Sequence, residues 1–397
     1  MQNILMQTAL NITTAIAVLL FIGAICSWLA NRTKVPEILL LIITGMIFGN
    51  ITYKGAPLIE LPEAFLAAIA MVALAMIVFD STTRLRIKEF DTFSGQALKL
   101  MIISVIFNLT IVTIAAHYLL KIPISLSILF AGIISGTSPD VILPISEHIK
   151  KIKTTALLKL ESIFNTPLTI IIPIMVIDII GEVQTKIITG IVDQIVPFVM
   201  KFIVGIGSGV FIGLILFKIM QKAYKEIYSP LAVIIAALLT YVLAENLGGS
   251  GVIAVTSLGL FFGNVYVKEK LTVLKIESVF TKALFVLIFM LTGVIIKIPL
   301  KKTFFISGAA LLAIYYLTRF TAIEISMRKL TMKERIYTTL NAPKGIATAA
   351  IVFALSTFQM QGMGIVLDMV LAFILTTIII SSIITWLTPW FNETNNT

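Results

Sequence analysis

Charged residues are scarce in this chain of 397 residues: Asp, Glu, Lys and Arg together make up 13% of it, and 58% is hydrophobic. An ordinary soluble domain is about a quarter charged, so this composition excludes that class of protein. The single cysteine, Cys26, excludes an internal disulfide framework and a thiolate metal cluster. His117 and His148 are too few for a His-rich metal site.

Long apolar runs fill most of the chain instead. A membrane helix needs about 20 apolar residues to cross a hydrocarbon core of about 30 Å. Windows of that length predict thirteen spans, at residues 4–30, 35–53, 63–82, 96–119, 123–146, 155–180, 193–218, 227–246, 250–266, 279–297, 303–327, 334–357 and 364–389. We therefore expect an all-α polytopic membrane protein whose residues 1–397 form a single transmembrane domain. The loops are too short to hold a soluble domain.

The net charge of +10 has to be interpreted by position. Loops after odd-numbered spans and their flanks hold 19 Lys and Arg residues, and the opposite side holds 6. Basic residues collect in cytoplasmic loops, so the loops after odd-numbered spans are expected in the cytoplasm. This orientation puts the N-terminus on the outer side of the cell membrane and the C-terminus in the cytoplasm. The expected partner of these charges is the lipid surface, and no nucleic-acid binding is implied.

Two pairs of segments suggest an internal repeat. Span 2 ends in Gly45–Asn50 (GMIFGN) and span 9 in Gly259–Asn264 (GLFFGN), and copies seven spans apart must be inverted. Such glycine-rich ends also recur by chance, because small residues let helices pack closely. Spans 5 and 12, again seven apart, are interrupted by Gly and Pro at Ser135–Asp140 and Asn341–Gly345. We expect inverted repeats over about 35–180 and 250–389, with discontinuous spans 5 and 12 at a transporter's midplane site.

The interruption in span 5 places Thr137 and Asp140 where a desolvated cation needs oxygen atoms. Asp140 can also be a counter-charge to the positive ends of two half-helices. Lys344 would then compensate the negative ends of the half-helices. The two roles are compatible, and both stay open.

Span 6 carries polar residues on one face. Glu161 and Asn165 are four residues apart, and Ser162 and Thr166 form a second such pair beside them. This face must look into the protein, because four polar side chains are costly in hydrocarbon. Ser162 and Thr166 are either ion ligands or part of a structural hydrogen-bonded seam.

A buried Glu161 needs a positive partner. Arg319, in the middle of span 11, is the preferred one, because a guanidinium cannot neutralise itself by losing its proton. Glu324 competes for Arg319 but points elsewhere around the helix. Asp80, at the end of span 3, is either a site acid or a solvated helix end beside Arg84.

Together these residues resemble the monovalent cation/proton antiporter superfamily, in particular its NhaP-like archaeal and bacterial sodium/proton exchangers. The similarity covers nearly the whole chain: Val35–Ile38 (VPEI), Gly45–Asn50, Leu243–Gly248, Ser250–Val252, Asn264, Arg319, Pro343–Gly345 and, most specifically, Glu161–Asn165 (ESIFN) with Pro167 and Leu168. The resemblance implies that Glu161 and Arg319 form a structural bridge. It also implies ion ligands from Ser162, from the 137–139 segment and from Asp80.

Two departures from the family pattern affect the proton carrier. The family's Asn-Asp is Asn165-Thr166 here, and its Thr-Asp-Pro is Thr137-Ser138-Pro139, with the acid two positions later at Asp140. Either Asp140, helped by Asp80, carries the exchanged ion, or proton coupling is lost. The candidate ion- and proton-binding residues are Asp140, Asp80, Thr137, Ser162, Asn165 and Thr166.

The expected function is exchange of Na⁺, or another small monovalent cation, for H⁺, which contributes to pH homeostasis. One carboxylate couples the two ions when binding of either ion excludes the other, which requires the pKa of the carboxyl group to lie near the working pH.

Ion gradients drive such transport, so no cofactor is implied. The alternative is a passive channel or uniporter without proton coupling. An enzyme is not expected, because the chain has no HExxH motif and no Ser, His and Asp set at membrane depth. The family is commonly homodimeric.

Overall fold

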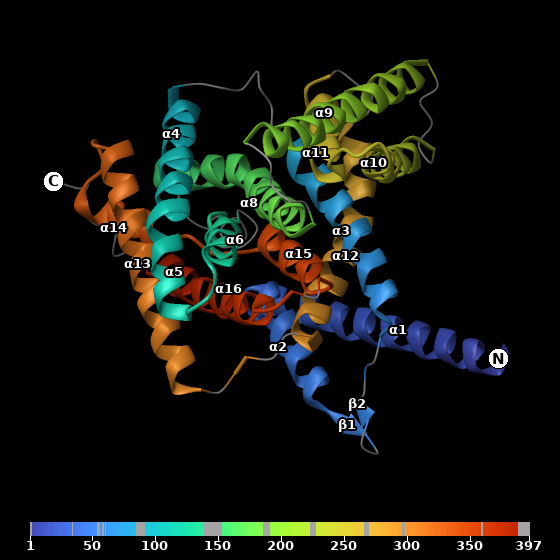
Figure 1. The fold of residues 1–397 in the computed structure, drawn as a ribbon, viewed down its shortest axis with the longest axis horizontal. Helices are drawn as coiled ribbons and strands as arrows, with labels where there is room; N and C mark the ends of the chain where they lie inside the picture. Colours follow the sequence, from blue (N-terminus) through green and yellow to red (C-terminus); the bar gives the residue numbers. More distant parts are fainter. Residues whose placement is uncertain are drawn as a thin grey trace.

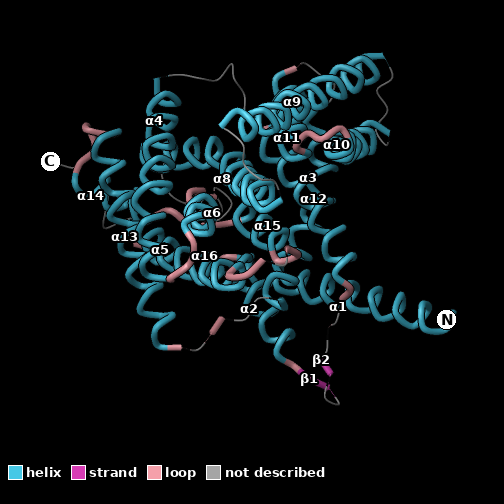
Figure 2. Tube along the Cα trace, in the orientation of Figure 1, coloured by secondary structure: helices cyan, strands magenta, loops and turns pink. Residues whose placement is uncertain are grey.

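The computed structural model describes residues 2–33, 35–53, 56–57, 59, 61–84, 92–138, 153–185, 191–222, 228–265, 270–295, 298–299, 301–358 and 360–387. This part of the chain is helical except for one small antiparallel hairpin, β1 (Thr52–Tyr53) and β2 (Ala56–Pro57), and the connecting segments (Figure 2). The expected all-α class is confirmed for these residues.

The described helices are shown in chain order in Figure 1. In the first half they are α1 (Gln2–Thr33), α2 (Glu37–Asn50), α3 (Glu63–Thr83), α4 (Thr92–Phe107), the π-helical turn η2 (Asn108–Val112), α5 (Thr113–Leu120), α6 (Ile124–Ile134) and α8 (Lys153–Thr185). In the second half they are α9 (Ile191–Lys222), α10 (Tyr228–Asn246), α11 (Gly251–Asn264), α12 (Lys270–Ile295), α13 (Lys302–Ser326), α14 (Met332–Leu340), α15 (Ile346–Leu355) and α16 (Met363–Trp386).

Nine of the described helices are long and apolar enough to cross a membrane. Four shorter apolar helices, α2, α6, α11 and α15, lie where the sequence predicts spans 2, 5, 9 and 12. The count of thirteen membrane spans stays a prediction. Span 10 was predicted to begin at residue 279, but α12 already begins at Lys270, because Lys270, Lys275 and Glu277 lower the local hydropathy without breaking the helix.

Local sequence explains where several helices begin. Pro36, Pro62 and Pro123 each stand directly before a helix, where the fixed φ of proline suits the first turn and its missing N–H costs nothing. Helix α14 begins with a capping box, in which Thr331 and Glu334 satisfy each other's backbone amides. It ends at Leu340, and α15 begins only at Ile346, so residues 341–345 are not helical.

The two glycine-rich helix ends make close helix crossings. A Cβ on Gly45 of α2 would lie 2.2 Å from the Met290 carbonyl oxygen of α12, and one on Gly259 of α11 would lie 1.9 Å from the Thr82 hydroxyl of α3. Neither position has room for a side chain. These glycines therefore let α2 approach α12, and α11 approach α3, at backbone distance.

Helix α6 lies in the middle of the molecule, with α8, α15 and α16 packed around it (Figure 1). Helices α9, α10 and α11 pack on one another and meet the rest of the chain largely through α3 and α12. Residues 135–138 follow α6 and residues 341–345 precede α15, so both non-helical segments lie close to this central group.

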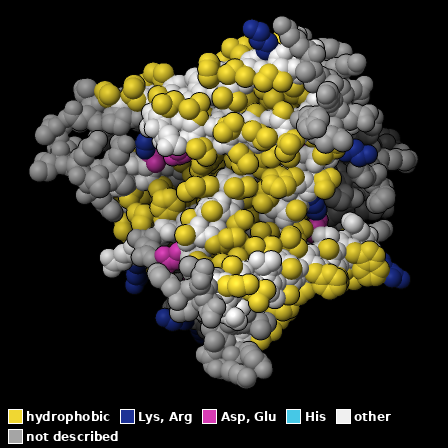
Figure 3. Space-filling model, turned by 90° about the vertical axis from the view of Figure 1, so that its right-hand side faces the viewer, with side chains coloured by type: hydrophobic (Ala, Val, Ile, Leu, Met, Phe, Trp, Pro, Cys, Tyr) yellow, Lys and Arg dark blue, Asp and Glu magenta, His cyan; other side chains and the backbone are white. Residues whose placement is uncertain are grey.

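The outer faces of α1 and α9 are strongly apolar (Figure 3). The exposed large side chains include Met6, Leu10, Phe21, Ile25 and Trp28 on α1, and Val199, Ile203, Ile206, Phe211, Leu214 and Ile219 on α9. Soluble monomers rarely expose apolar patches of this extent. Such surfaces are favourable in contact with lipid, and the backbone polar groups there are satisfied within the helices.

Candidate functional site

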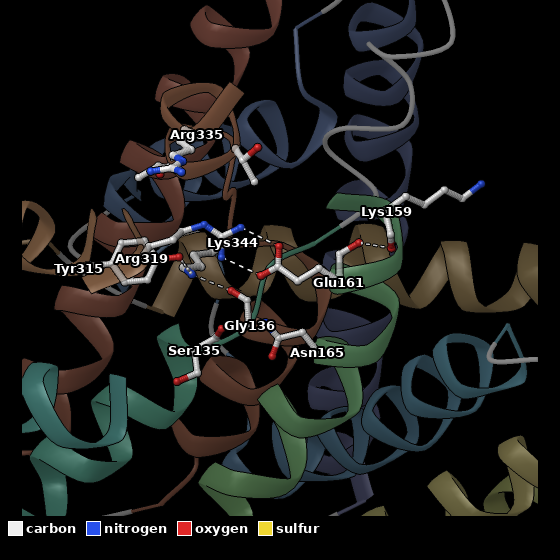
Figure 4. Close-up of polar contacts among 12 residues, drawn as sticks. Ser135, Gly136, Lys159, Glu161, Asn165, Tyr315, Arg319, Arg335 and Lys344 are labelled. Atoms are coloured by element: carbon white, nitrogen blue, oxygen red, sulfur yellow. Dashed lines mark hydrogen bonds and ion pairs between the residues drawn. The ribbon is translucent and has the colours of Figure 1, made fainter. Parts of the chain in front are cut away.

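A buried ion pair connects α8 to α13. The Arg319 guanidinium donates two parallel hydrogen bonds to Glu161, 2.8 Å to Oε1 and 2.7 Å to Oε2 (Figure 4). Glu161 is fully buried and Arg319 nearly so. Glu324, the competing partner considered from the sequence, instead contacts Arg335 at 3.3 Å near the surface. Two-point contact between planar groups fixes the relative position of both helices.

Lys344 lies in the non-helical segment between α14 and α15, and it is completely buried. Its ammonium donates hydrogen bonds to the Gly136 carbonyl at 2.7 Å and to the Tyr315 hydroxyl at 2.5 Å (Figure 4). The ammonium also lies 4.1 Å from the centre of the Tyr315 ring. Lys344 therefore donates to a carbonyl that follows the end of α6, and the helix-end role considered from the sequence stays a prediction.

The two non-helical segments meet directly. The Ser138 amide donates a hydrogen bond of 2.9 Å to the Pro343 carbonyl, and the Lys344 amide bonds to the Thr377 hydroxyl of α16 at 3.1 Å. The Asn165 amide group of α8 donates to the Ser135 carbonyl at 2.9 Å. Four stretches far apart in sequence thus converge on one buried polar group.

Two neutral oxygens of this group have no hydrogen-bond partner within the described part of the chain. They are the Thr137 hydroxyl and Asn165 Oδ1, both buried. Leaving a buried polar atom without a hydrogen bond is costly, so the presence of two such atoms needs an explanation. Both atoms carry free lone pairs, and coordination of a cation is an explanation that suits them.

The hydroxyls of Ser162 and Thr166 donate their hydrogen bonds to backbone carbonyls and not to each other. Ser162 donates to the Lys159 carbonyl at 2.8 Å, and Thr166 donates to the Ser162 carbonyl at 2.7 Å. Both protons are therefore directed to the backbone of α8 itself. A hydroxyl oxygen used as donor keeps its lone pairs, so both can still coordinate a cation.

The two candidate acids have separate places. Asp80 lies near the end of α3 and binds Arg84 at 2.7 Å, with its side chain 19% exposed and that of Arg84 50% exposed. This arrangement corresponds to the helix end beside Arg84, which the sequence analysis considered as the alternative to a site acid. Asp140 lies outside the described residues.

Two buried polar residues, Tyr315 and Glu277, were missed by sequence reasoning. Tyr315 is fully buried against Lys344, four residues before Arg319. Glu277 is fully buried on α12, but the predicted span began two residues after it. The spacing of Glu277 and Thr281, four residues apart on one helix face, was the available signal.

Known proteins resemble the chain over nearly all of its length. The family model described as sodium/hydrogen exchanger, transmembrane, matches residues 16–392. "Probable Na(+)/H(+) antiporter 2" of Methanocaldococcus jannaschii is 26% identical over 370 residues, covering 87% of this chain and 84% of that protein. "K(+)/H(+) antiporter NhaP" of Alkalimonas amylolytica is 27% identical over 178 residues, or 44% of this chain and 31% of the relative.

Among solved structures, the sodium proton antiporter MjNhaP1 from Methanocaldococcus jannaschii at pH 8 superposes with a TM-score of 0.78. The alignment covers 97% of this chain and 99% of the other, at 20% identity, so it establishes a shared fold. With the family match over residues 16–392, these similarities show that the chain is a multi-pass membrane protein of the sodium/hydrogen exchanger family, within the monovalent cation/proton antiporter superfamily.

Proposed function

We propose that this protein is a secondary antiporter that exchanges a monovalent cation for H⁺. The observation that carries the proposal is the buried group around Thr137 and Asn165, which offers unpartnered neutral oxygens between two non-helical segments. Such segments at membrane depth are tolerated where they line a cavity or are buried in protein. The family is one of transporters, and ion gradients supply the driving force, so the proposal includes no enzymatic step.

Na⁺ is the cation first proposed, because two relatives that match 87% and 84% of the chain are named for Na⁺. Other relatives, which match 44% to 66% of the chain, are named for K⁺, so the transport assay has to include both ions. Asp140 is the proposed carrier, helped by Asp80, with Thr137, Ser162, Asn165 and Thr166 as neutral ligands. Protonated, Asp140 cannot hold the cation, and with the cation bound it cannot take the proton.

The proposed architecture is an inverted repeat over about 35–180 and 250–389, with spans 5 and 12 discontinuous. The same helix crossing occurs twice, which supports the repeat. Helix α2 of the first repeat corresponds to α11 of the second, and α3 of the first corresponds to α12 of the second. Both mixed pairs, α2 with α12 and α11 with α3, are close crossings mediated by glycine. Alternating access then moves the group containing the half-helices against the rest of the protein.

The exchange is tested with purified protein in liposomes that carry an imposed pH gradient. We expect the gradient to dissipate on addition of NaCl, with LiCl and KCl as the parallel arms and choline chloride as the control. Cation flux that is insensitive to the pH gradient would instead identify a channel or uniporter. Absence of both gradient dissipation and cation flux with all three cations would reject antiport and the channel alike.

The proposed topology has its own expected result. Basic odd-numbered loops place Met1 outside and Thr397 in the cytoplasm. A protease-sensitive tag fused after Thr397 should therefore resist cleavage in right-side-out vesicles and be cut in inverted ones. Cleavage in the right-side-out vesicles would mean that the span count or the orientation is wrong.

A further inference from the structure

Helix α16 carries a row of three buried hydroxyl side chains, Thr377, Ser381 and Thr385, spaced four residues apart. Thr377 and Ser381 have no solvent exposure, and Thr385 is 2% exposed. Residues at this spacing lie on one face of a helix. On α16 that face contacts the non-helical segment 341–345, which interrupts span 12. We call these three residues the hydroxyl row.

One end of the 341–345 segment is held by two members of the hydroxyl row. Asn341 is fully buried. Its side-chain amide donates a hydrogen bond of 3.1 Å to the Thr385 hydroxyl, and its Oδ1 accepts one from the Ser381 hydroxyl. A shift of Asn341 along α16 would break both bonds.

The other end of the segment is held by Thr377. The Lys344 backbone amide donates to the Thr377 hydroxyl at 3.1 Å. The Thr377 hydroxyl donates its own proton to the Phe373 carbonyl at 2.7 Å, so its oxygen is free to act as the acceptor for the amide. A buried backbone amide outside a helix needs such a partner.

Lys344 passes this constraint to the backbone on both sides of Thr137, whose hydroxyl is a proposed cation ligand. The Lys344 ammonium donates to the Gly136 carbonyl at 2.7 Å, directly before Thr137 (Figure 4). The Ser138 amide, directly after Thr137, donates to the Pro343 carbonyl at 2.9 Å. The position of Thr137 therefore depends on the position of residues 343–344.

The packing around these contacts leaves no slack. A Cβ on Gly345 would lie 2.2 Å from the Ser138 hydroxyl, and one on Gly136 would lie 1.7 Å from the Thr169 hydroxyl of α8. Closely packed segments transmit small displacements to their neighbours. A shift of the 341–345 segment on α16 is thus expected to shift residues 136–138.

Resting on the exchange function proposed above, we propose that Thr377 is a positioning residue of the cation site. By accepting the Lys344 amide, it fixes the residue whose ammonium holds the Gly136 carbonyl. Thr137 follows Gly136 directly, so Thr377 sets where the Thr137 hydroxyl is presented. Ser381 supports the other end of the same segment. Both hydroxyls act on the cation through other residues, as the supporting groups of a binding site do.

Cation-dependent thermal stability of the purified protein tests this role without requiring transport. Unfolding midpoints are measured against NaCl, KCl and LiCl, with choline chloride to control ionic strength. Valine keeps the shape of threonine but cannot accept the amide, so in Thr377→Val the cation concentration for half of the stabilisation should rise about three- to tenfold. Thr377→Ser keeps the oxygen and should stay within about twofold of the wild type. A lower midpoint in choline chloride with an unchanged half-stabilising concentration would show a merely structural role and reject the proposal.

Neighbouring hydroxyls on α16 provide matched controls. Thr376 and Ser382 each donate to a carbonyl of α16 itself at 2.7 Å. Thr376→Val and Ser382→Ala should therefore leave the half-stabilising concentration unchanged, and a shift in them as large as in Thr377→Val would reject the positioning role. Ser381→Ala should raise the concentration in the same direction as Thr377→Val. It decides the question if Thr377→Val does not accumulate in the membrane.

Liposome exchange separates this inference from the proposed function. Thr377→Val should raise the KM for the cation by the same factor and leave the rate at saturating cation largely intact. If Thr377→Val matches the wild type in both half-stabilising concentration and KM, the positioning role is rejected while exchange stands. Wild-type protein that exchanges no protons, but whose stabilisation by cation is weakened by Thr377→Val, would reject antiport and keep the positioning role.

Discussion

Glu161→Met is expected to lower the stability of the protein by about 3 to 5 kcal/mol, because it strands the buried Arg319 charge. The guanidinium cannot lose its proton. Arg319→Met strands Glu161 instead, but a buried carboxyl group can take up a proton and become neutral. We therefore expect Glu161→Met to be the more damaging change, seen as a lower unfolding midpoint and less protein in the membrane.

The double variant E161M/R319M is the decisive comparison. Removing both charges leaves no stranded ion, and apolar replacement of a buried pair is often neutral or stabilising. The double variant should therefore be more stable than either single variant. Glu324→Met is the control on the same helix, because it removes an acid from a surface pair with Arg335, and surface pairs contribute only about 0 to 1 kcal/mol. A double variant as unstable as the worse single one would show that the two charges do not compensate each other.

Asp140→Asn should abolish cation-dependent proton movement in liposomes and leave the protein folded. The amide keeps the shape of the carboxyl group but can neither take up the proton nor neutralise a cation. Asp80→Asn, by contrast, should weaken the apparent cation affinity without ending exchange. The unfolding midpoint of each variant, measured beside the flux, separates loss of transport from loss of folding.

A second substitution tests the same assignment by rescue. Thr166 is buried one turn from Ser162 and next to Asn165, where the family pattern has an aspartate. Thr166→Asp in the Asp140→Asn background should restore part of the exchange, because a new acid then faces the same ligands. If Asp140→Asn keeps full cation-dependent dissipation and an unchanged pH optimum, Asp140 is only a counter-charge to the helix ends. The carrier would then have to be sought at Asp80.

The membrane architecture could be predicted from composition and hydropathy, because the lipid imposes strong local rules. Helix length and apolar content are properties of short stretches, and they predicted most helices to within a few residues. The start of α12 was missed because Lys270, Lys275 and Glu277 interrupt the apolar pattern although the helix continues through them. Hydropathy reports what faces lipid, and Glu277 faces the protein.

By itself, the sequence determined the all-α membrane class, the family and the need for a partner of Glu161, since each follows from residue type and spacing. Only the tertiary structure decided which groups meet across the fold. Lys344 reaches Gly136 and Tyr315, and the Ser138 amide meets Pro343. These contacts join residues about 30 to more than 200 positions apart, and no local pattern encodes such distances. They depend on how α3, α6, α8, α12 and α13 pack, which is decided by close glycine crossings and buried charge pairing together.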